Sequence, residues 1–158
     1  MKERDIKEYE LRKYTRHPAI LDKLLSQRNF FLDMEPIKDS CKYLTKLIED
    51  GHDVVIVTQL PRRSNHWAAR DKKQWLETHI PALDLCQLIF AHRKDLVMGD
   101  VLFDDSPHHL QSWLVKNPDS YICTIDYPYN QDIKTDARFA KETAWKNFYS
   151  FVNKLKSR

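Results

Sequence analysis

The stretch Asp53–Thr58, with the sequence DVVIVT, decides the fold class of this chain. Its four consecutive apolar residues lie between polar neighbours, which is the pattern of a short strand buried on both faces. Strands of this kind occur in parallel sheets that helices cover on both sides. The sequence therefore predicts an α/β protein built around a parallel sheet.

Further strand and helix patterns alternate along the rest of the chain. Short apolar runs predict strands over residues 88–91, 100–104 and 121–125. Longer amphipathic or polar stretches predict helices over residues 37–50, 66–79, 107–115 and 135–155. This alternation implies a mostly parallel sheet with helices on both faces.

The first 28 residues have a different pattern. Apolar residues recur over residues 2–28 at spacings near three and four, which predicts helix. Pro18 is expected to divide this region, because proline lacks a backbone N–H and restricts the residue before it. We predict N-terminal helices over residues 1–28 and a core domain over residues 29–158.

Composition excludes several classes of protein. The chain has 158 residues, which suits one ordinary domain, and its apolar runs are too short to cross a bilayer. Its three cysteines are widely spaced and odd in number, which favours reduced thiols over a disulfide framework. The charged first residues do not resemble a signal peptide. These features predict a cytoplasmic protein with no membrane contact.

The charge balance and the glycine content limit the possible ligands. The net charge is only +3, so a nucleic-acid partner is not expected. The chain has two glycines, which excludes the glycine-rich loops that approach phosphates in nucleotide-binding motifs.

Chemically useful side chains follow the predicted strands. Ligands of parallel α/β sheets bind beyond the carboxyl ends of the strands, where Thr58, Lys94, Asp104 and Asp105 are expected. A threonine hydroxyl can donate to a phosphoryl oxygen, a lysine can neutralise it, and carboxylates can hold Mg²⁺. Each residue alone could instead be structural, because aspartates also cap helices and most lysines are solvated. Together they favour a phosphate and magnesium site.

Other conspicuous residues have two interpretations. Arg62 and Arg63 follow Thr58 and could either meet a phosphate or form a solvated loop. The pair His108–His109 suggests a transition-metal site, but a polar helix start after Pro107 explains it better, since no cysteine is near in sequence. Packing roles are expected for several aromatic residues, namely Trp75, Tyr127, Tyr129 and Trp145.

The same strand ends carry a resemblance to a known family. The strand ending at Thr58 resembles the second motif of the haloacid dehalogenase superfamily, Lys94 its third-motif lysine, and Leu102–Asp105 its acidic fourth motif. Within that superfamily the chain is most similar to the 5′(3′)-deoxyribonucleotidase family, especially its bacterial and phage branch. The supporting segments run in the expected order from Asn29 to Val152, and include Asn29–Phe31, Asn65–Trp67, Lys72–Glu77, His92–Leu96, Asp104–Pro107 and Asp126–Asn130.

This resemblance implies a fold, a substrate class and a set of site residues. The fold would be a haloacid-dehalogenase-like Rossmannoid sheet with helices on both faces, and residues 1–28 would be the remnant of a helical cap. The ligand would be a nucleoside monophosphate, or phosphate itself, bound with Mg²⁺. The resemblance assigns phosphate binding to Thr58, Gln59, Lys72 and Lys94, and metal binding to Asp104 and Asp105.

The sequence departs from the family pattern in one respect. The family begins with a strand that ends in Asp-x-Asp-Gly, whose aspartates act as nucleophile and general acid, and these 158 residues contain no Asp-x-Asp. By resemblance, the absent strand would be central, between those ending at Thr58 and Asp104. The neighbouring strands could close up, a second copy could donate a segment, or a separate N-terminal fragment could complete the sheet.

The functional prediction follows from that departure. No catalytic residue is identified, and the Mg²⁺ site would be incomplete. The sequence therefore predicts a nucleotidase-like phosphatase-family protein that is inactive as this chain alone. The alternative is a non-catalytic protein that binds a nucleotide or phosphate and serves a regulatory role.

Overall fold

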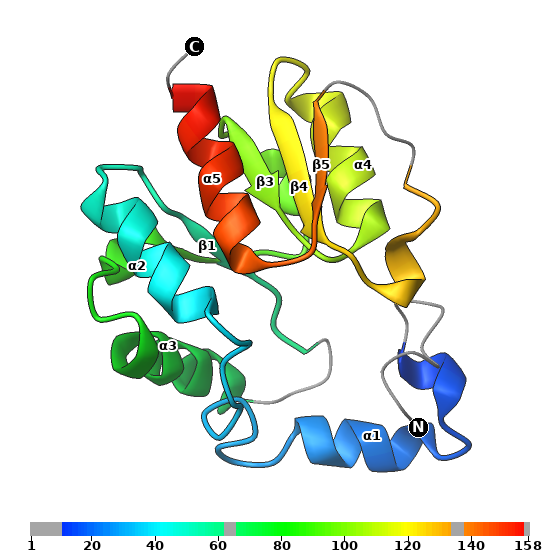
Figure 1. Cartoon of the computed structure of the whole chain (residues 1–158). Coiled ribbons are helices and arrows are strands. Elements are labelled where there is room, and N and C mark those ends of the chain that lie inside the picture. Colours follow the sequence, from blue (N-terminus) through cyan, green and yellow to red (C-terminus); the bar gives the residue numbers. More distant parts are fainter. Residues whose placement is uncertain (1–10, 62–65, 134–137, 157–158) are drawn as a thin grey trace. The chain divides into compact units, whose positions relative to one another are not determined.

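The parallel β-strands of this chain are short and are separated by helices, as the computed structural model shows for residues 11–61, 66–133 and 138–156. Figure 1 shows the arrangement of the elements along the chain. In order, they are η2 (Leu11–Tyr14), α1 (Pro18–Leu25), α2 (Ser40–Glu49), β1 (Ile56–Thr58), α3 (Ala68–His79), η3 (Leu85–Gln87), β2 (Leu88–Phe90), η4 (Lys94–Leu96), β3 (Val101–Phe103), α4 (Pro107–Lys116), β4 (Tyr121–Ile125), η5 (Pro128–Asn130), β5 (Phe139–Glu142) and α5 (Trp145–Lys156).

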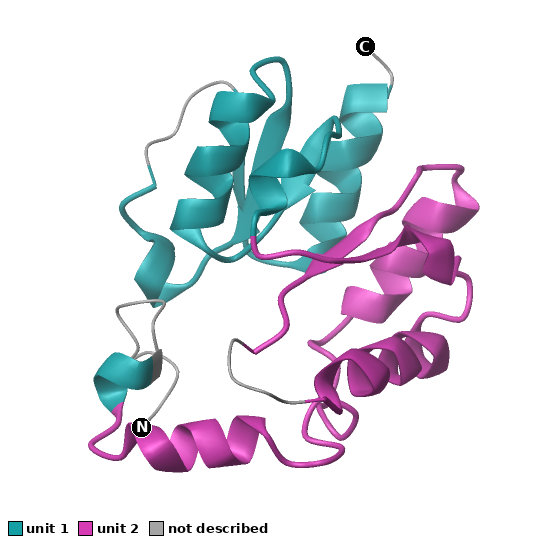
Figure 2. Ribbon diagram, turned by 180° about the vertical axis from the view of Figure 1, so that it is seen from behind, with its two compact units in different colours: residues 1–14, 93–158 teal, residues 15–92 magenta. Residues whose placement is uncertain are grey.

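The chain forms two compact units, which are coloured separately in Figure 2. Unit 1 consists of Met1–Tyr14 and Arg93–Arg158, and unit 2 consists of Thr15–His92. Unit 2 contains the parallel pair β1–β2, and unit 1 contains a parallel sheet in the order β3–β4–β5. The predicted boundary between residues 28 and 29 stays a prediction.

The core of unit 2 lies between its two-stranded sheet and helices α2 and α3. Ile56 and Leu88 are paired neighbours on β1 and β2, and both pack against a buried cluster of α3 and the residues after it. Leu44 and Ile48 bring α2 to the same cluster. Helix α2 ends at Glu49, and Gly51 follows with a φ of 80°, a conformation that glycine adopts without a steric penalty.

The sheet of unit 1 is covered on both faces. Leu102 packs with α4 residues Leu110 and Trp113, and the neighbouring residue Phe103 packs against the rings of Trp145 and Phe148 on α5. Successive strand residues point to opposite faces, so α4 and α5 lie on opposite sides of the sheet, as Figure 1 shows. This packing fixes the end of β3, which is where the predicted metal residues begin.

The predicted α/β class is confirmed, since the described residues form parallel strands and five α-helices. The haloacid-dehalogenase-like arrangement of the sheet stays a prediction. All four predicted strands are present, although β1 begins at Ile56 rather than at Asp53. Helix α1 begins at Pro18, where the sequence predicted a break, and residues 1–10 lie outside the described part of the chain. None of the described helices is long and apolar enough to cross a membrane.

The predicted helix over residues 135–155 is wrong in its first part. Phe139–Glu142 forms strand β5, paired in parallel with β4, and helix α5 begins only at Trp145. The charged residues Lys141 and Glu142 gave this segment a helical pattern. It is a strand because the open edge of β4 offers it a ladder of backbone hydrogen bonds, which outweighs local propensity.

Most of the described strands have a neighbour on one side only. Among the described residues, β1 and β2 pair only with each other, and β3 and β5 each pair with β4 alone. The described strands thus form two separate short sheets rather than one continuous sheet.

Candidate functional site

In unit 2, a lysine and a threonine meet at the carboxyl end of β1. Lys72, near the start of α3, donates from Nζ to Oγ1 of Thr58, the last residue of β1, at 2.8 Å. The same ammonium lies 4.5 Å from the ring centroid of Phe31, a distance at which a cation is attracted to an aromatic face. Thr58 accepts this hydrogen bond, so its hydroxyl proton can still be donated to an anion.

Gln59 has a different neighbour. Its Nε2 donates to the backbone carbonyl of His92 at 3.4 Å, which links the segments that follow β1 and β2. This contact is structural, and the phosphate-binding role of Gln59 stays a prediction.

A network that the sequence did not predict holds the start of α3. The guanidinium of Arg70 donates to Asn29 Oδ1 at 2.7 Å and to Asp71 Oδ1 at 2.6 Å, and Asp71 is fully buried. The guanidinium carbons of Arg28 and Arg70 lie 5.0 and 4.8 Å from the centroid of the Trp67 ring, which is within the range of a cation–π interaction. This network links the start of α3 to Asn29, in the segment between α1 and α2, and so restrains the helix that carries Lys72.

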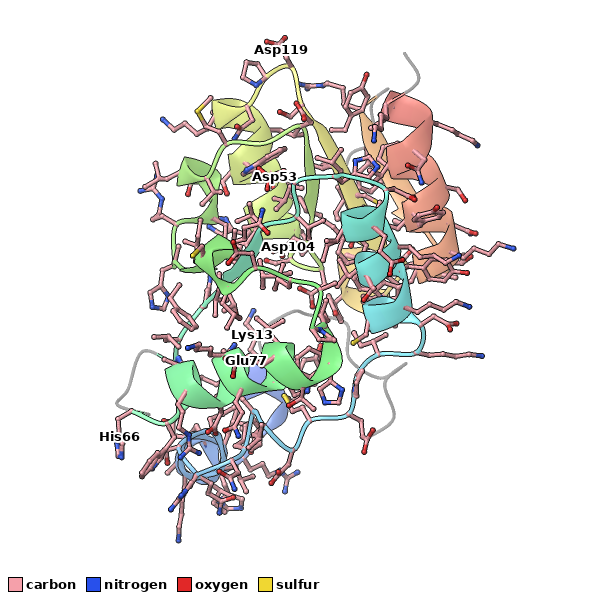
Figure 3. All side chains as sticks on the ribbon, turned by 90° about the vertical axis from the view of Figure 1, so that its left-hand side faces the viewer. Lys13, Asp53, His66, Glu77, Asp104 and Asp119 are labelled. Atoms are coloured by element: carbon pink, nitrogen blue, oxygen red, sulfur yellow. The ribbon has the colours of Figure 1, made fainter. Side chains whose placement is uncertain are left out.

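In unit 1, Asp104 follows β3, and three groups contact the oxygens of its carboxylate. Its Oδ2 accepts from Lys94 Nζ at 2.6 Å, its Oδ1 accepts from the backbone N–H of Ser106 at 2.9 Å, and His109 Nδ1 lies 3.2 Å from Oδ1. Figure 3 labels Asp104 and Asp119, which lie at opposite ends of this sheet. Asp104 is therefore at the carboxyl end of the strands, where the sequence predicted the metal residues.

The two adjacent carboxylates differ in their ionisation. Burial alone would raise the pKa of Asp104, but the hydrogen bond from His109 and the charge of Lys94 together lower this pKa below its ordinary value. Burial and the negative charge of Asp104 raise the pKa of Asp105, and a hydrogen bond from Tyr129 offsets part of that rise. The surroundings of Asp105 thus only partly compensate the charge of its ionised form.

Sequence reasoning missed two neighbours of these carboxylates. The hydroxyl of Tyr129 donates to Asp105 Oδ2 at 3.0 Å, in addition to the stacking of its ring on Tyr127 at 5.2 Å between centroids. His109, expected only as part of a polar helix start, lies against Asp104. The signal in the sequence was weak, because neither residue is within three positions of its partner.

The carboxylates fit Mg²⁺ in kind but supply only part of its coordination. Oxygen ligands suit this ion, and a cation would offset the incompletely compensated charge of Asp105. No cluster of three or more His, Cys, Asp or Glu residues suited to a metal occurs within the described ranges. Waters and ligand phosphate oxygens would have to complete the shell, as is common for Mg²⁺.

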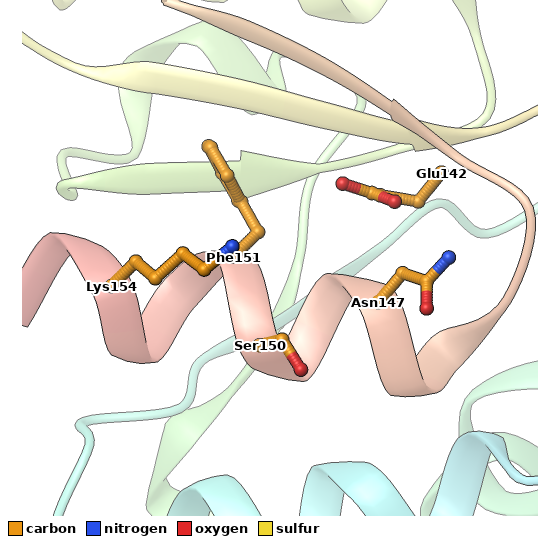
Figure 4. Close-up of a pocket in the computed structure, with 5 residues that line it drawn as sticks. All are labelled: Glu142, Asn147, Ser150, Phe151 and Lys154. Carbon is orange, nitrogen blue, oxygen red and sulfur yellow. The ribbon is translucent and has the colours of Figure 1, made fainter.

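A separate hollow lies between β5 and α5 of unit 1 (Figure 4). Glu142, Asn147, Ser150, Phe151 and Lys154 line it, and it includes none of the residues predicted to bind phosphate or metal. Its opposed charges and its open shape do not single out a ligand.

The predicted site residues are thus divided between the two units. Unit 2 holds Thr58, Gln59 and Lys72, and brings Thr58 and Lys72 into contact. Unit 1 holds Lys94, Asp104 and Asp105, and pairs Lys94 with Asp104. Arg62 and Arg63 lie outside the described residues.

Known proteins similar to this chain share one description. A Staphylococcus epidermidis protein assigned to the 5′(3′)-deoxyribonucleotidases is 23% identical over 139 residues, which cover 88% of this chain and 72% of that protein. A Staphylococcus aureus protein with the same assignment is 27% identical over 131 residues, covering 83% and 67%. The human cytosolic-type 5′(3′)-deoxyribonucleotidase is 29% identical over 91 residues, covering 56% and 45%.

A family model gives the assignment. The model described as 5′ nucleotidase, deoxy (Pyrimidine), cytosolic type C protein matches residues 2–158, which is nearly the whole sequence. The resemblance drawn from the strand ends is thereby confirmed at the level of the family, and this chain belongs to the family of cytosolic type C 5′(3′)-deoxyribonucleotidases.

Proposed function

We propose that this chain binds the phosphate group of a nucleoside monophosphate. The observation that carries the proposal is the contact between Lys72 and Thr58 at the carboxyl end of β1. Two side chains that both carry donor protons converge there, in a chain whose family and relatives are named as nucleotidases. Gln59, the next residue along the chain after Thr58, would supply a further donor to a phosphoryl oxygen.

Asp104 and Asp105 would hold Mg²⁺ in this proposal. When bound, the ion would neutralise phosphoryl oxygens as a Lewis acid. Lys94 has three ammonium protons and uses one on Asp104, so the others can be donated to an anion. His109 and the Ser106 N–H hold the Asp104 carboxylate in place.

Hydrolysis needs a nucleophile, and the sequence contains no Asp-x-Asp. We propose that the catalytic aspartates belong to a segment outside these 158 residues. Among the described strands, β1, β2, β3 and β5 each pair on one side only, so each has an open edge to which a strand could be added. A donated segment could come from a second copy or from a separate N-terminal fragment.

The alternative function expected from the sequence uses the same phosphate site. The chain could act as a binding or regulatory protein that recognises a nucleotide without cleaving it. The two functions share the phosphate site and differ only in the presence of a nucleophile. The cytoplasmic location stays a prediction, in keeping with the cytosolic type named for the human relative.

The phosphate site that the two functions share is tested by calorimetric titration. The purified chain is titrated with deoxynucleoside 5′-monophosphates in the presence of Mg²⁺. We expect binding that inorganic phosphate competes away and that Thr58→Val weakens. A folded chain that binds none of these nucleotides contradicts the proposal.

Phosphate release separates the two functions. A peptide with an apolar strand followed by Asp-x-Asp-Gly is added to the chain together with Mg²⁺ and a deoxynucleotide. Release that depends on both peptide aspartates supports the completed enzyme, whereas binding without release favours the regulatory protein.

A further inference from the structure

We propose that Tyr129 is a positioning residue, which orients the Asp105 carboxylate toward a bound divalent cation. This inference rests on the proposed function, because it takes Asp105 to be a cation ligand. Its observation is the hydrogen bond from the Tyr129 hydroxyl to Asp105 Oδ2 at 3.0 Å. The two residues are 24 positions apart, so the tertiary structure of unit 1 creates this contact.

The backbone that carries Tyr129 is held by a buried amide. Tyr129 lies in the single turn η5, and the side chain of Asn130, in the same turn, is fully buried. Asn130 Nδ2 donates to Thr124 Oγ1 at 3.0 Å and to the Ile125 carbonyl at 2.7 Å. Its Oδ1 accepts from the Tyr127 N–H at 3.0 Å. The turn is thereby fixed to the end of β4, whose neighbour β3 leads into Asp104 and Asp105.

The ring of Tyr129 is held as well. It stacks on the ring of Tyr127 with an interplanar angle of 10°. This stacking limits the rotation of the Tyr129 ring and so restrains the position of its hydroxyl. A packing role alone would need only the ring. The hydroxyl in addition fixes one carboxylate oxygen, which is how hydrogen-bonded neighbours of metal ligands commonly orient them.

Asp104 does not depend on this contact. It has its own donors in Lys94, Ser106 and His109. Removing the Tyr129 hydroxyl should therefore disturb Asp105 selectively. Phenylalanine keeps the ring and the stacking, so Tyr129→Phe isolates the hydroxyl.

The test measures the binding of Mn²⁺, an ion that takes the same oxygen ligands as Mg²⁺. Electron paramagnetic resonance measures the concentration of free Mn²⁺ in each titration. Wild type, Tyr129→Phe, Asp105→Asn and the control Tyr121→Phe are titrated. Tyr121 starts β4 at the other end of the sheet and contacts the ring of Phe151, so its variant also removes one hydroxyl from unit 1.

We expect Tyr129→Phe to weaken Mn²⁺ binding about tenfold. Tyr121→Phe should bind like wild type, and both tyrosine variants should unfold like wild type in urea. In an Asp105→Asn background, Tyr129→Phe should have no further effect on Mn²⁺ binding.

Two results would overturn the inference and are distinguishable. If wild type binds Mn²⁺ through Asp105 and Tyr129→Phe binds it equally well, the positioning role is wrong and the proposed metal site stands. If wild type binds no Mn²⁺ at all, the metal part of the proposed function fails together with the inference.

Discussion

Lys94 Nζ and Asp104 Oδ2 form a largely buried ion pair at 2.6 Å, with side chains that are 15% and 3% exposed. The pair joins the start of η4 to the end of β3, ten residues apart. It places a lysine ammonium at the carboxyl end of β3, next to the two carboxylates of the predicted metal site.

Asp104→Asn should lower the free energy of unfolding by about 1–3 kcal/mol, because Lys94 then loses its hydrogen-bonded carboxylate partner. Asparagine keeps the shape of the side chain, so the effect reports charge and hydrogen bonding. Urea unfolding at neutral pH measures it. Asp119→Asn, in an exposed turn of the same unit, is the control and should be neutral. Equal stability of Asp104→Asn and wild type would show that the ion pair contributes nothing net.

Asp105→Asn should have a pH-dependent effect of a defined sign. The folded pKa of Asp105 is raised above 3.8 by burial and by Asp104. A raised folded pKa contributes stability below the unfolded value, and this is lost as pH rises through the folded pKa. The stability of wild type relative to Asp105→Asn should therefore fall as pH increases across that window.

Urea unfolding of both proteins at a series of pH values gives this difference directly. Asp104 has a lowered folded pKa, so the same comparison made with Asp104→Asn should show the opposite pH dependence. A stability difference that stays constant with pH would mean that Asp105 titrates normally in the folded protein.

Lys72→Met should weaken the binding of inorganic phosphate or a nucleoside monophosphate by about tenfold or more, since a charge-assisted hydrogen bond contributes about 1.5–3 kcal/mol. Methionine keeps much of the apolar stem beside Phe31. The matched control is Lys73→Met, which removes an adjacent lysine that is 55% exposed and pairs with Glu77. Calorimetric titration compares the two variants, and similar affinities would place the phosphate elsewhere.

Asn130→Ala should destabilise the chain by about 2–4 kcal/mol, because the Ile125 carbonyl, the Thr124 hydroxyl and the Tyr127 N–H all lose a buried partner. Asn147→Ala removes an exposed amide whose contact with Thr143 is 3.3 Å, and it should cost little. Thermal or urea unfolding ranks the two variants. Comparable losses would show that η5 is not held by Asn130.

Much of the fold was predictable from local pattern. The apolar run that ends at Thr58 and the run at Tyr121–Ile125 are strands in the structure. The burial predicted on both faces holds for the centre of β4, whereas β1 is only half-buried. Pro18 marked the start of a helix through its backbone restriction. The family was also recognisable from the order of short motifs around the strand ends.

Strand β5 was not predictable in this way. Residues 139–142 contain a lysine and a glutamate, which favour helix in isolation, and the segment is a strand only because the edge of β4 can pair with it. An edge partner several residues away in sequence leaves no periodic signal, so local reasoning extended the following helix through it.

The sequence by itself determined the residue types of the candidate site and their positions after parallel strands. Only the tertiary structure decided which side chains meet. It paired Lys72 with Thr58, Lys94 with Asp104, and Tyr129 with Asp105. Such contacts depend on how helices and turns pack against the strand ends, and packing joins residues 10 to 24 positions apart that no local periodicity relates.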